Sequence, residues 1–162
     1  MEEIQVRRAE ACDLGSLLAL HLALQDHLES ASPDLWRMTP QARQQLEGQL
    51  AARLAAPESC VLVAEDKQWR LVGTASGRIV TNGRYLPARS GVIDQLYVLR
   101  EHRRRGIGSL LVAELRRFFI GHEIRDVSLR SMYGNAQAEA FWEALGFTPR
   151  IVTLGTRLAG GP

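Results

Sequence analysis

Cysteine, lysine and aromatic residues are scarce in this sequence, and each scarcity argues against a class of protein. Cys12 and Cys60 lie far apart and form no C-x-x-C pair, so we expect free, buried thiols in a reducing compartment, and no metal site or thiol nucleophile. Lysine occurs once, at Lys67, which leaves no G-K-[ST] sequence for a P-loop. Aromatic residues make up 6% of the chain and are not interleaved with its basic residues, which argues against a nucleic-acid-binding surface.

A strong net charge and a long apolar run are also missing. Lysine and arginine together number 20 and the acidic residues 18, so the net charge of +2 requires no nucleic-acid partner. No stretch is apolar enough to span a membrane, and the acidic start at residues 1–3 is unlike a secretion signal. We therefore expect a cytoplasmic protein without a membrane partner. Its 162 residues contain no repeat and suit a single domain, 1–162, with a substantial core.

The most informative stretch of the chain runs from Gly91 to Gly121. It reads as a strand over residues 92–98, a basic loop over 103–108 and a helix over 109–120. Gly121 follows the last apolar residue of that helix and is expected to close it in a left-handed conformation. The apolar residues with helical spacing on one side of it are Ile107, Leu110, Leu111, Leu115, Phe118 and Phe119.

The start of this helix has the chemistry of a diphosphate cradle. Its first backbone N–H groups have no partner within the helix, and the helix dipole adds partial positive charge there. Gly106 and Gly108 let a phosphate approach the backbone closely, and the arginines at 103–105 add full positive charges. Two plainer interpretations remain open: a solvated arginine run and a tight connection. A dinucleotide fingerprint is excluded, because Leu111 stands where its third glycine belongs.

Two motifs resemble those of the GNAT superfamily of N-acetyltransferases. Arg103, Gly106 and Gly108 satisfy R-x-x-G-x-G, directly after a strand that ends in Leu-Tyr-Val. Residues 135–147 resemble the second motif of that family, N-x-x-A-x-x-x-Y-x-x-x-G-F. The two motifs occur in the family's order, with a predicted strand between them. The order of all the predicted elements also matches that of the family, so the resemblance covers nearly the whole chain.

The resemblance implies a fold, a cofactor and a reaction. The fold is of the α/β (α+β) class, with a mixed, mostly antiparallel central sheet, about four flanking helices and the order β-α-α-β-β-β-α-β-α-β. The reaction is the transfer of an acetyl group from acetyl-CoA to a primary amine of a small molecule or peptide, by direct attack in a ternary complex, with coenzyme A as product. The alternative is a catalytically silent acyl-CoA-binding or regulatory module. Family habit also makes a homodimer possible.

The remaining elements follow from periodicity and capping signals. Asp13 is expected to cap a helix that reaches about Glu29, residues 30–38 form a loop, and Thr39 with Pro40 starts a second helix that Pro57 stops. Asn135 is a suitable cap for the helix that Gly146 closes. The other strands are predicted over residues 4–8, 61–64, 71–75, 126–130 and 150–158.

The resemblance also implies which residues hold the cofactor. The pantetheine arm is expected along the strand that ends in Leu-Tyr-Val, which splays away from the strand after the central helix, and the pyrophosphate at the basic loop. The family's bulge in this strand has no visible signal, since no glycine or proline interrupts residues 92–98. The cofactor-binding candidates are Leu96, Tyr97, Val98, Arg103, Arg104, Arg105, Gly106, Ile107, Gly108, Ser109, Asn135, Phe141 and Trp142.

Acyl transfer to an ammonium acceptor needs a base and benefits from an acid. Asp94 is the candidate base, and strand alternation would place it on the face of Leu96 and Val98. It can instead bind the acceptor or form an ordinary salt bridge. Trp142 stands where the family usually carries a tyrosine acid, and an indole N–H is not a usable acid. Tyr133, or else Tyr97, is the substitute candidate, while Trp142 can wall the thioester pocket or simply pack in the core.

The acceptor site is expected at the loop between the first two helices and at the loops flanking the central strand. No metal ligand is predicted. The substrate-binding candidates, chosen by location and by a polar or aromatic character, are His27, Glu29, Asp34, Trp36, Tyr85 and Asp94.

Overall fold

The computed structural model describes residues 4–158 of the chain. Short 3₁₀ turns at Ala11–Asp13 and Arg100–His102 supplement the regular elements. The helices and strands follow one another as β1 (Gln5–Arg8), α1 (Leu14–Ala31), α2 (Pro33–Trp36), α3 (Pro40–Ala55), β2 (Ser59–Glu65), β3 (Leu71–Thr81), β4 (Arg89–Val98), α4 (Ile107–Gly121), β5 (Val127–Leu129) and α5 (Ala136–Ala144).

The strands form one sheet in the order β1-β2-β3-β4-β5. The pairs β1–β2, β2–β3 and β3–β4 are antiparallel, and only β4–β5 is parallel. The parallel pair follows from the chain order, because α4 is the crossover that joins β4 to β5. This mixed, mostly antiparallel sheet confirms the predicted fold class.

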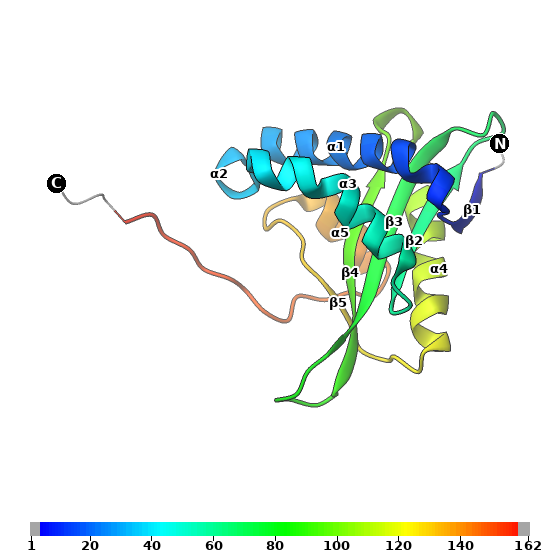
Figure 1. The fold of residues 1–162 in the computed structure, drawn as a ribbon. Helices are drawn as coiled ribbons and strands as arrows, with labels where there is room; N and C mark the ends of the chain where they lie inside the picture. The colour runs from blue at the N-terminus through cyan, green and yellow to red at the C-terminus, as the bar shows by residue number, and fades with distance from the viewer. Residues whose placement is uncertain (1–3, 159–162) are drawn as a thin grey trace. The chain divides into compact units, whose positions relative to one another are not determined.

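The two faces of the sheet are covered by different helices. Figure 1 shows α1 and α3 over one face and α4 over the other. Helix α4 comes so close that a Cβ built on Gly91 would lie 2.7 Å from Phe119 Cε1, and one on Gly77 would lie 2.9 Å from Phe119 Cζ. Glycine at these two strand positions is what allows the buried ring to touch the sheet. The α4 face is therefore the tightly packed side.

A β-bulge interrupts β4 at Asp94. Ile93 pairs with Gly77, and Gln95 pairs with the adjacent residue of β3, Ser76. Asp94 therefore has no partner of its own on β3. Because directly paired residues share a face, Gln95 and Leu96 then continue the alternation on opposite sides of the sheet. The bulge expected from the family is present, although the sequence carries no glycine or proline to mark it.

The parallel pairing of β4 with β5 stops early. It joins Gly91, Val92 and Ile93 to residues 127–129 and goes no further in the described part of the chain. Beyond Ile93, β4 keeps its partner β3 on one side only. The edge of β4 over residues 94–98 is therefore open toward β5, as the predicted splay requires.

Local capping signals predicted several helix ends. Thr39 Oγ1 accepts a hydrogen bond from the N–H of Ala42 at 3.2 Å at the start of α3. Asn135 Oδ1 accepts one from the N–H of Ala138 at 3.1 Å at the start of α5. Gly146, with φ of 81°, donates its N–H to the carbonyl of Glu143 at 2.8 Å and closes α5. These three predictions are confirmed.

Other local predictions are wrong. Asp13 makes no side-chain cap for α1, because its carboxylate instead accepts hydrogen bonds from Arg7 and from the N–H of Glu10. The predicted loop 30–38 contains the short helix α2. Helix α4 ends at Gly121 without a left-handed residue there, and Glu123, with φ of 62°, makes the left-handed turn.

The structure corrects three further expectations, on two residues expected to be buried and on the last strand. Leu110, assigned to the buried side of the central helix, is 49% exposed. Cys60 is buried, which raises the pKa of its thiol, but Cys12 is exposed. Residues 148–158 form neither helix nor strand, so the predicted last strand is absent from them. Their backbone pairs with no strand of the sheet, and Ile151 is 89% exposed.

The chain divides into two compact units, one reaching to Arg130 and the other beginning at Ser131. The first contains the whole sheet with α1 to α4, and the second contains α5. Among the described residues, no helix has the length and apolar character needed to cross a membrane.

Candidate active site

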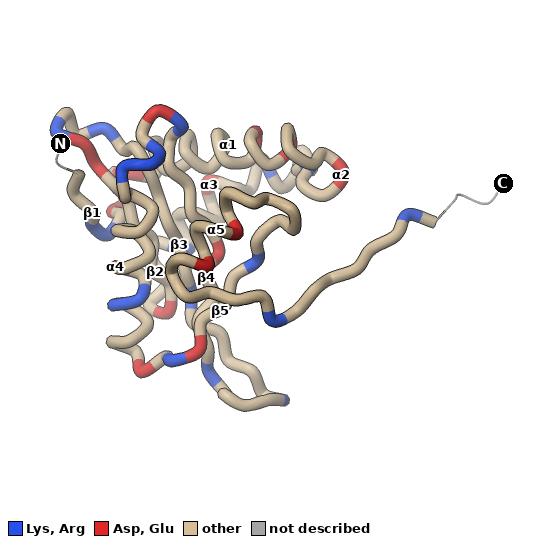
Figure 2. The backbone as a smooth tube through the Cα atoms, turned by 180° about the vertical axis from the view of Figure 1, so that it is seen from behind, with Lys and Arg blue, Asp and Glu red and all other residues tan. Residues whose placement is uncertain are grey.

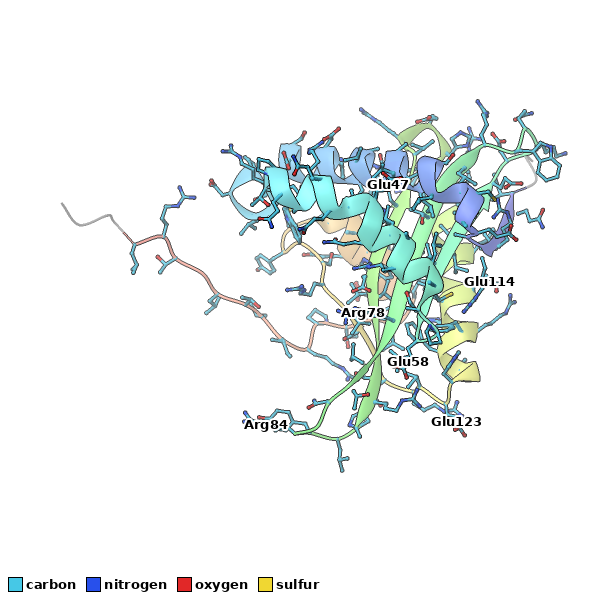
Figure 3. The ribbon with its side chains drawn as sticks, in the orientation of Figure 1. Glu47, Glu58, Arg78, Arg84, Glu114 and Glu123 are labelled. Atoms are coloured by element: carbon cyan, nitrogen blue, oxygen red, sulfur yellow. The ribbon has the colours of Figure 1, made fainter. Side chains whose placement is uncertain are left out.

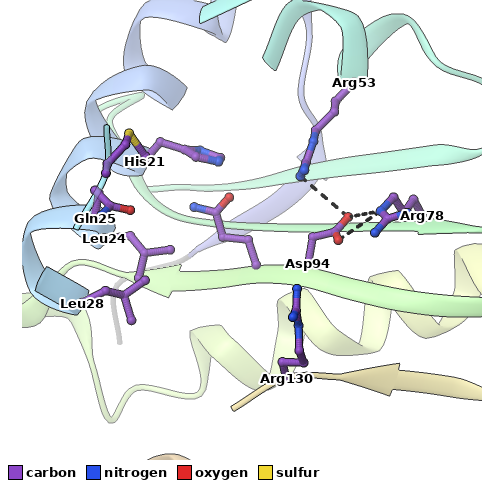
Figure 4. Close-up of a pocket in the computed structure, with 10 residues that line it drawn as sticks. His21, Leu24, Gln25, Leu28, Arg53, Arg78, Asp94 and Arg130 are labelled. Atoms are coloured by element: carbon purple, nitrogen blue, oxygen red, sulfur yellow. Dashed lines mark hydrogen bonds and ion pairs between the residues drawn. The ribbon is translucent and has the colours of Figure 1, made fainter. Parts of the chain in front are cut away.

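The first unit contains a cavity of about 360 Å³ on the α1 and α3 side of the sheet. Its charged lining comes from four elements: Arg53 near the end of α3, Arg78 on β3, Asp94 on β4, and Arg130 directly after β5. Figure 4 shows the three guanidinium groups directed toward the part of the cavity where Asp94 lies. The lining therefore combines three positive charges with one negative charge.

Asp94 is held by two of these arginines. Arg78 Nε lies 3.1 Å from each carboxylate oxygen, and Arg53 Nη1 lies 3.7 Å from Oδ2. Only 15% of the Asp94 side chain is exposed, whereas the residue as a whole is exposed. Most of its accessible surface is therefore backbone, which the bulge and the end of the β5 pairing lay open. The carboxylate is fixed in one orientation at the cavity wall.

The sheet face of Asp94 differs from the predicted one. Leu96 pairs with Ala75, and Val98 pairs with Gly73, whose Cβ would meet Leu111 of α4. Asp94 instead contacts Arg53 of α3, on the other side of the sheet. The prediction that it shares a face with Leu96 and Val98 is wrong, because the bulge adds one residue and reverses the alternation.

The cavity lining also includes uncharged polar side chains, two of which come from α1 and β4. His21 projects from α1, and Gln95, only 8% exposed, follows the bulge on β4. Burial and, after it, the positive charge of Arg53 together lower the pKa of His21 to about 4. The ring is thus neutral at pH 7. Among the described residues, His21 Nδ1 and Gln95 Nε2 are buried without a hydrogen-bond partner.

Of the predicted substrate-binding residues, Asp94 lines the cavity and Glu29 organises its edge. Glu29 Oε1 accepts hydrogen bonds from the N–H of Met38 at 2.8 Å and from Gln25 Nε2 at 2.9 Å, and both of those residues line the cavity. These hydrogen bonds, that from Met38 first, lower the pKa of Glu29. Glu29 therefore stabilises the connection between α1 and α3.

The other predicted acceptor residues do not line this cavity. His27 and Asp34 are exposed on α1 and α2, and the side chain of Trp36, 37% exposed, closes α2. Tyr85 is 67% exposed in the loop joining β3 to β4. Figure 3 shows its neighbour Arg84 at the far tip of this hairpin. Contact of these residues with an acceptor stays a prediction.

The loop before α4 presents backbone donors at its end. The first residue of this helix to find an intrahelical carbonyl is Leu110, whose N–H donates to Gly106 at 3.1 Å, and no side chain caps the helix. The N–H groups of residues 107–109 are thus left for another partner. Arg104 and Gly106 have φ of 64° and 78°, which curls the loop around this end. Figure 2 shows the basic run at the N-terminal end of α4.

Arg103 ties this loop to the end of β4. Its Nε donates to the carbonyl of Val98 at 2.9 Å, and its guanidinium lies 5.5 Å from the centre of the Tyr97 ring. The first arginine of R-x-x-G-x-G therefore fixes the loop beside the open edge of residues 94–98. The edge offers backbone groups of the kind that an extended amide-bearing arm can use, and the helix start offers N–H groups that a phosphate can use.

The second unit carries the other motif. Trp142 on α5 stacks edge-on with Phe141 at 5.0 Å and with Phe147 at 5.3 Å between ring centres. Asn135 caps the helix. Tyr133 precedes it and is 92% exposed. The cap and the aromatic cluster show structural roles for these residues, and their cofactor or catalytic roles stay predictions.

Sequence reasoning missed most of the cavity. His21 was visible only as one position of an amphipathic helix, and nothing marked Gln95, because regular alternation would have placed it on the other face. Arg53, Arg78 and Arg130 are ordinary arginines in the sequence. Their spacing carries no signal, since the folded sheet alone brings them together.

The comparisons with known proteins agree with this fold. The sequence model described as the Acetyltransferase (GNAT) family matches residues 22–147. Among solved structures, a tetramutant of the BH1408 protein from Bacillus halodurans is 21% identical, with a TM-score of 0.83 over 95% of this chain and 99% of that one. No curated protein sequence matches the chain.

Two solved structures of similar fold are aminoglycoside acetyltransferases. The aminoglycoside antibiotic 6'-N-acetyltransferase AAC(6')-Ih from Acinetobacter baumannii is 16% identical, with a TM-score of 0.74 over 97% of this chain and 100% of that one. Aminoglycoside N-acetyltransferase AAC(6')-Iy in complex with CoA is 18% identical, with a TM-score of 0.72 over 98% and 97% of the two chains. At such identities the likeness shows a shared fold.

Proposed function

Because the chain belongs to the acetyltransferase (GNAT) family, we propose that it transfers an acetyl group from acetyl-CoA to a primary amine of a small molecule or peptide, by direct attack in a ternary complex. One observation supports this most strongly. The open edge of β4 over residues 94–98 runs into a basic loop whose helix start has uncapped N–H groups. The family's cofactor has matching parts, an amide-bearing arm and a pyrophosphate.

The chain's own groups fit this cofactor. The N–H groups of residues 107–109, with the charges of Arg104 and Arg105, would hold the pyrophosphate. The backbone of residues 94–98 would hydrogen-bond the pantetheine amides as an added strand. When bound, acetyl-CoA supplies an acyl group activated as a thioester. A backbone N–H of the same strand would stabilise the negative charge that develops on the acyl oxygen.

Asp94 is the residue we propose to receive the acceptor amine. Its carboxylate lines the cavity and its backbone belongs to the open strand edge, so one residue joins the two parts of the site. It would take the proton of the attacking ammonium directly or through water. His21, neutral at pH 7 with a pKa of about 4, is a weak base and serves better as a hydrogen-bonding group.

The proton for the departing thiolate needs a donor other than the usual one, because Trp142 stands where the family usually carries a tyrosine. Tyr133 remains our candidate acid, with Tyr97 as the alternative. Loss of a general acid lowers a rate by about 10²–10⁴. If a Tyr133→Phe variant keeps an unchanged rate, Tyr133 is not the general acid.

Two measurements test the proposed function. Acetyl-CoA at 100 times its dissociation constant should stabilise the folded protein by about 2.7 kcal/mol, detected as a rise in melting temperature. An amine panel, followed by release of free coenzyme A thiol, should then identify a substrate. The absence of a thermal shift would contradict cofactor binding. A thermal shift without thiol release from any amine would favour the alternative, a catalytically silent acyl-CoA-binding module.

A further inference from the structure

We infer that the acceptor bound in the 360 Å³ cavity carries a negatively charged group, a carboxylate or a phosphate, in addition to its amine. This inference deepens the proposed function and rests on it. The cavity lies on the α1 and α3 face of the sheet, and its charged lining is Arg53, Arg78, Arg130 and Asp94.

The charge of the lining is the first argument. Three guanidinium groups stay charged at any physiological pH, and one carboxylate offsets only one of them. The neighbouring His21 adds no negative charge. A net charge of two positive units in a partly enclosed space attracts anions and repels a molecule that carries several ammonium groups. An amine with no anionic group would leave this charge unbalanced.

The three arginines differ in how many contacts they already make with Asp94. Arg78 directs its Nε at both oxygens of Asp94, at 3.1 Å each. Arg53 makes one longer contact, at 3.7 Å. The side chain of Arg130 has no hydrogen-bond or ion-pair partner in the described part of the chain. Arg78 therefore positions Asp94, whereas Arg130 and Arg53 have N–H donors left for a ligand, in the planar arrangement that suits a carboxylate or phosphate.

A second, independent observation comes from the buried polar atoms. Gln95 is 8% exposed and lines the cavity, and its Nε2 has no partner among residues 4–158. Buried amide donors are nearly always hydrogen-bonded in folded proteins. His21 Nδ1 is buried and unpartnered in the same way. An oxygen-rich anionic group would satisfy the Gln95 donor and the arginines together.

The arrangement suits a small molecule with an amine and an anion close together. A cavity of this volume matches a small ligand. Asp94 can take the ammonium while Arg130 and Arg53 take the anion. Once a carboxylate is bound, one unit of positive charge remains in the lining, which disfavours a charged ammonium and so favours the neutral amine that attacks the thioester.

Three amines that share one skeleton provide the test. Ethanolamine has no anionic group, serine adds a carboxylate, and phosphoethanolamine adds a phosphate. Initial rates of thiol release from acetyl-CoA should give a kcat/KM at least about tenfold higher for serine or for phosphoethanolamine than for ethanolamine. The better of the two identifies the anion. A preference for ethanolamine, or for the polycation spermidine, would overturn the inference while confirming acetyl transfer.

A charge-matched pair of variants assigns any preference to the cavity. Arg130→Gln should lower kcat/KM for the anionic amine about tenfold more than for ethanolamine. Arg117→Gln removes the same charge from α4, on the opposite face of the sheet, and should keep the preference. An equal effect of both variants would overturn the assignment.

Direct binding separates this inference from the proposed function. Serine and phosphoethanolamine can be titrated calorimetrically into the protein saturated with coenzyme A. Binding of either one that Arg130→Gln weakens about tenfold, without turnover of any amine, would contradict the proposed function and leave the anion site standing. If neither anionic amine binds, the proposed anion site is wrong.

Discussion

At the scale of single residues, His21, in the wall of the cavity, makes the free energy of unfolding depend on pH. Its side chain is half-buried on α1, and this burial together with the nearby Arg53 lowers its pKa from 6.5 to about 4. Between these two values the unfolded chain binds a proton that the folded chain does not. The free energy of unfolding is therefore highest above pH 6.5 and falls as the pH drops toward 4.

His21→Gln should remove most of this pH dependence. The shift corresponds to at most about 3.5 kcal/mol between pH 6.5 and pH 4, because one pKa unit is about 1.4 kcal/mol. Urea unfolding at several pH values measures it. His27→Gln, on the exposed side of the same helix, controls for the loss of a histidine. Parallel stability curves for the wild type and His21→Gln would show that the ring is not buried in its neutral form.

Asp94→Asn tests the proposed base. The amide keeps the shape of the side chain but cannot accept the proton of an ammonium, so kcat should fall by about 10²–10⁴ once a substrate is known. The pH–rate profile should also lose its acidic limb. Asp26→Asn, on the exposed side of α1, is the matched control. A profile that Asp94→Asn leaves intact would assign the base elsewhere.

At this scale the sequence identified Asp94 but not its surroundings. The motif context marked the carboxylate, and the bulge then moved it to the other face of the sheet, next to Arg53 and Arg78. Bulges arise from the pairing of two strands and need no special residue in either. An alternation rule applied to one strand cannot detect them.

At the scale of the elements, the packing of α4 on the sheet depends on a close approach. A Cβ on Gly91 would lie 2.7 Å from Cε1 of Phe119, whose side chain is 1% exposed. Gly91→Ala should therefore lower the free energy of unfolding by about 1–3 kcal/mol in urea denaturation. Gly83→Ala, at the hairpin turn where a Cβ meets nothing within 4 Å, should change it by less than about 0.5 kcal/mol. Equal effects would show that the ring moves aside freely.

The start of α4 is tested by Gly108→Val. Gly108 lies in the first turn of the helix, where a branched side chain would crowd the uncapped N–H groups. We expect the variant to lose the thermal stabilisation by acetyl-CoA, about 2.7 kcal/mol at 100 times the dissociation constant. Gly48→Val makes the same change in α3, where a Cβ meets nothing within 4 Å, and should keep it. Full stabilisation of Gly108→Val would place the pyrophosphate elsewhere.

Elements were predictable where their signals are local. The caps at Thr39 and Asn135 and the glycine closure at Gly146 need only nearby residues, and all three are present. The tail over residues 150–158 was predicted as the last strand but forms no strand. A strand requires a neighbouring strand to pair with, and nothing in its own sequence supplies one.

At the scale of the whole molecule, two motifs identified the family, but the sequence composition hid the character of the cavity. The net charge of the chain is only +2, yet three arginines meet in one small space. Arg53, Arg78 and Arg130 lie on α3, on β3 and after β5, far apart in the sequence. Their proximity is a product of the folded sheet. A single domain and a homodimer stay predictions, the latter testable by light scattering.

A crystal structure of the complex with coenzyme A tests the central claim most directly. We predict the pyrophosphate within hydrogen-bond distance of the N–H groups of residues 107–109, and the pantetheine amides paired with the backbone of residues 94–98. The thiol should then point toward Asp94. A complex with the nucleotide bound elsewhere, or with β5 paired along the whole of β4, would contradict the account.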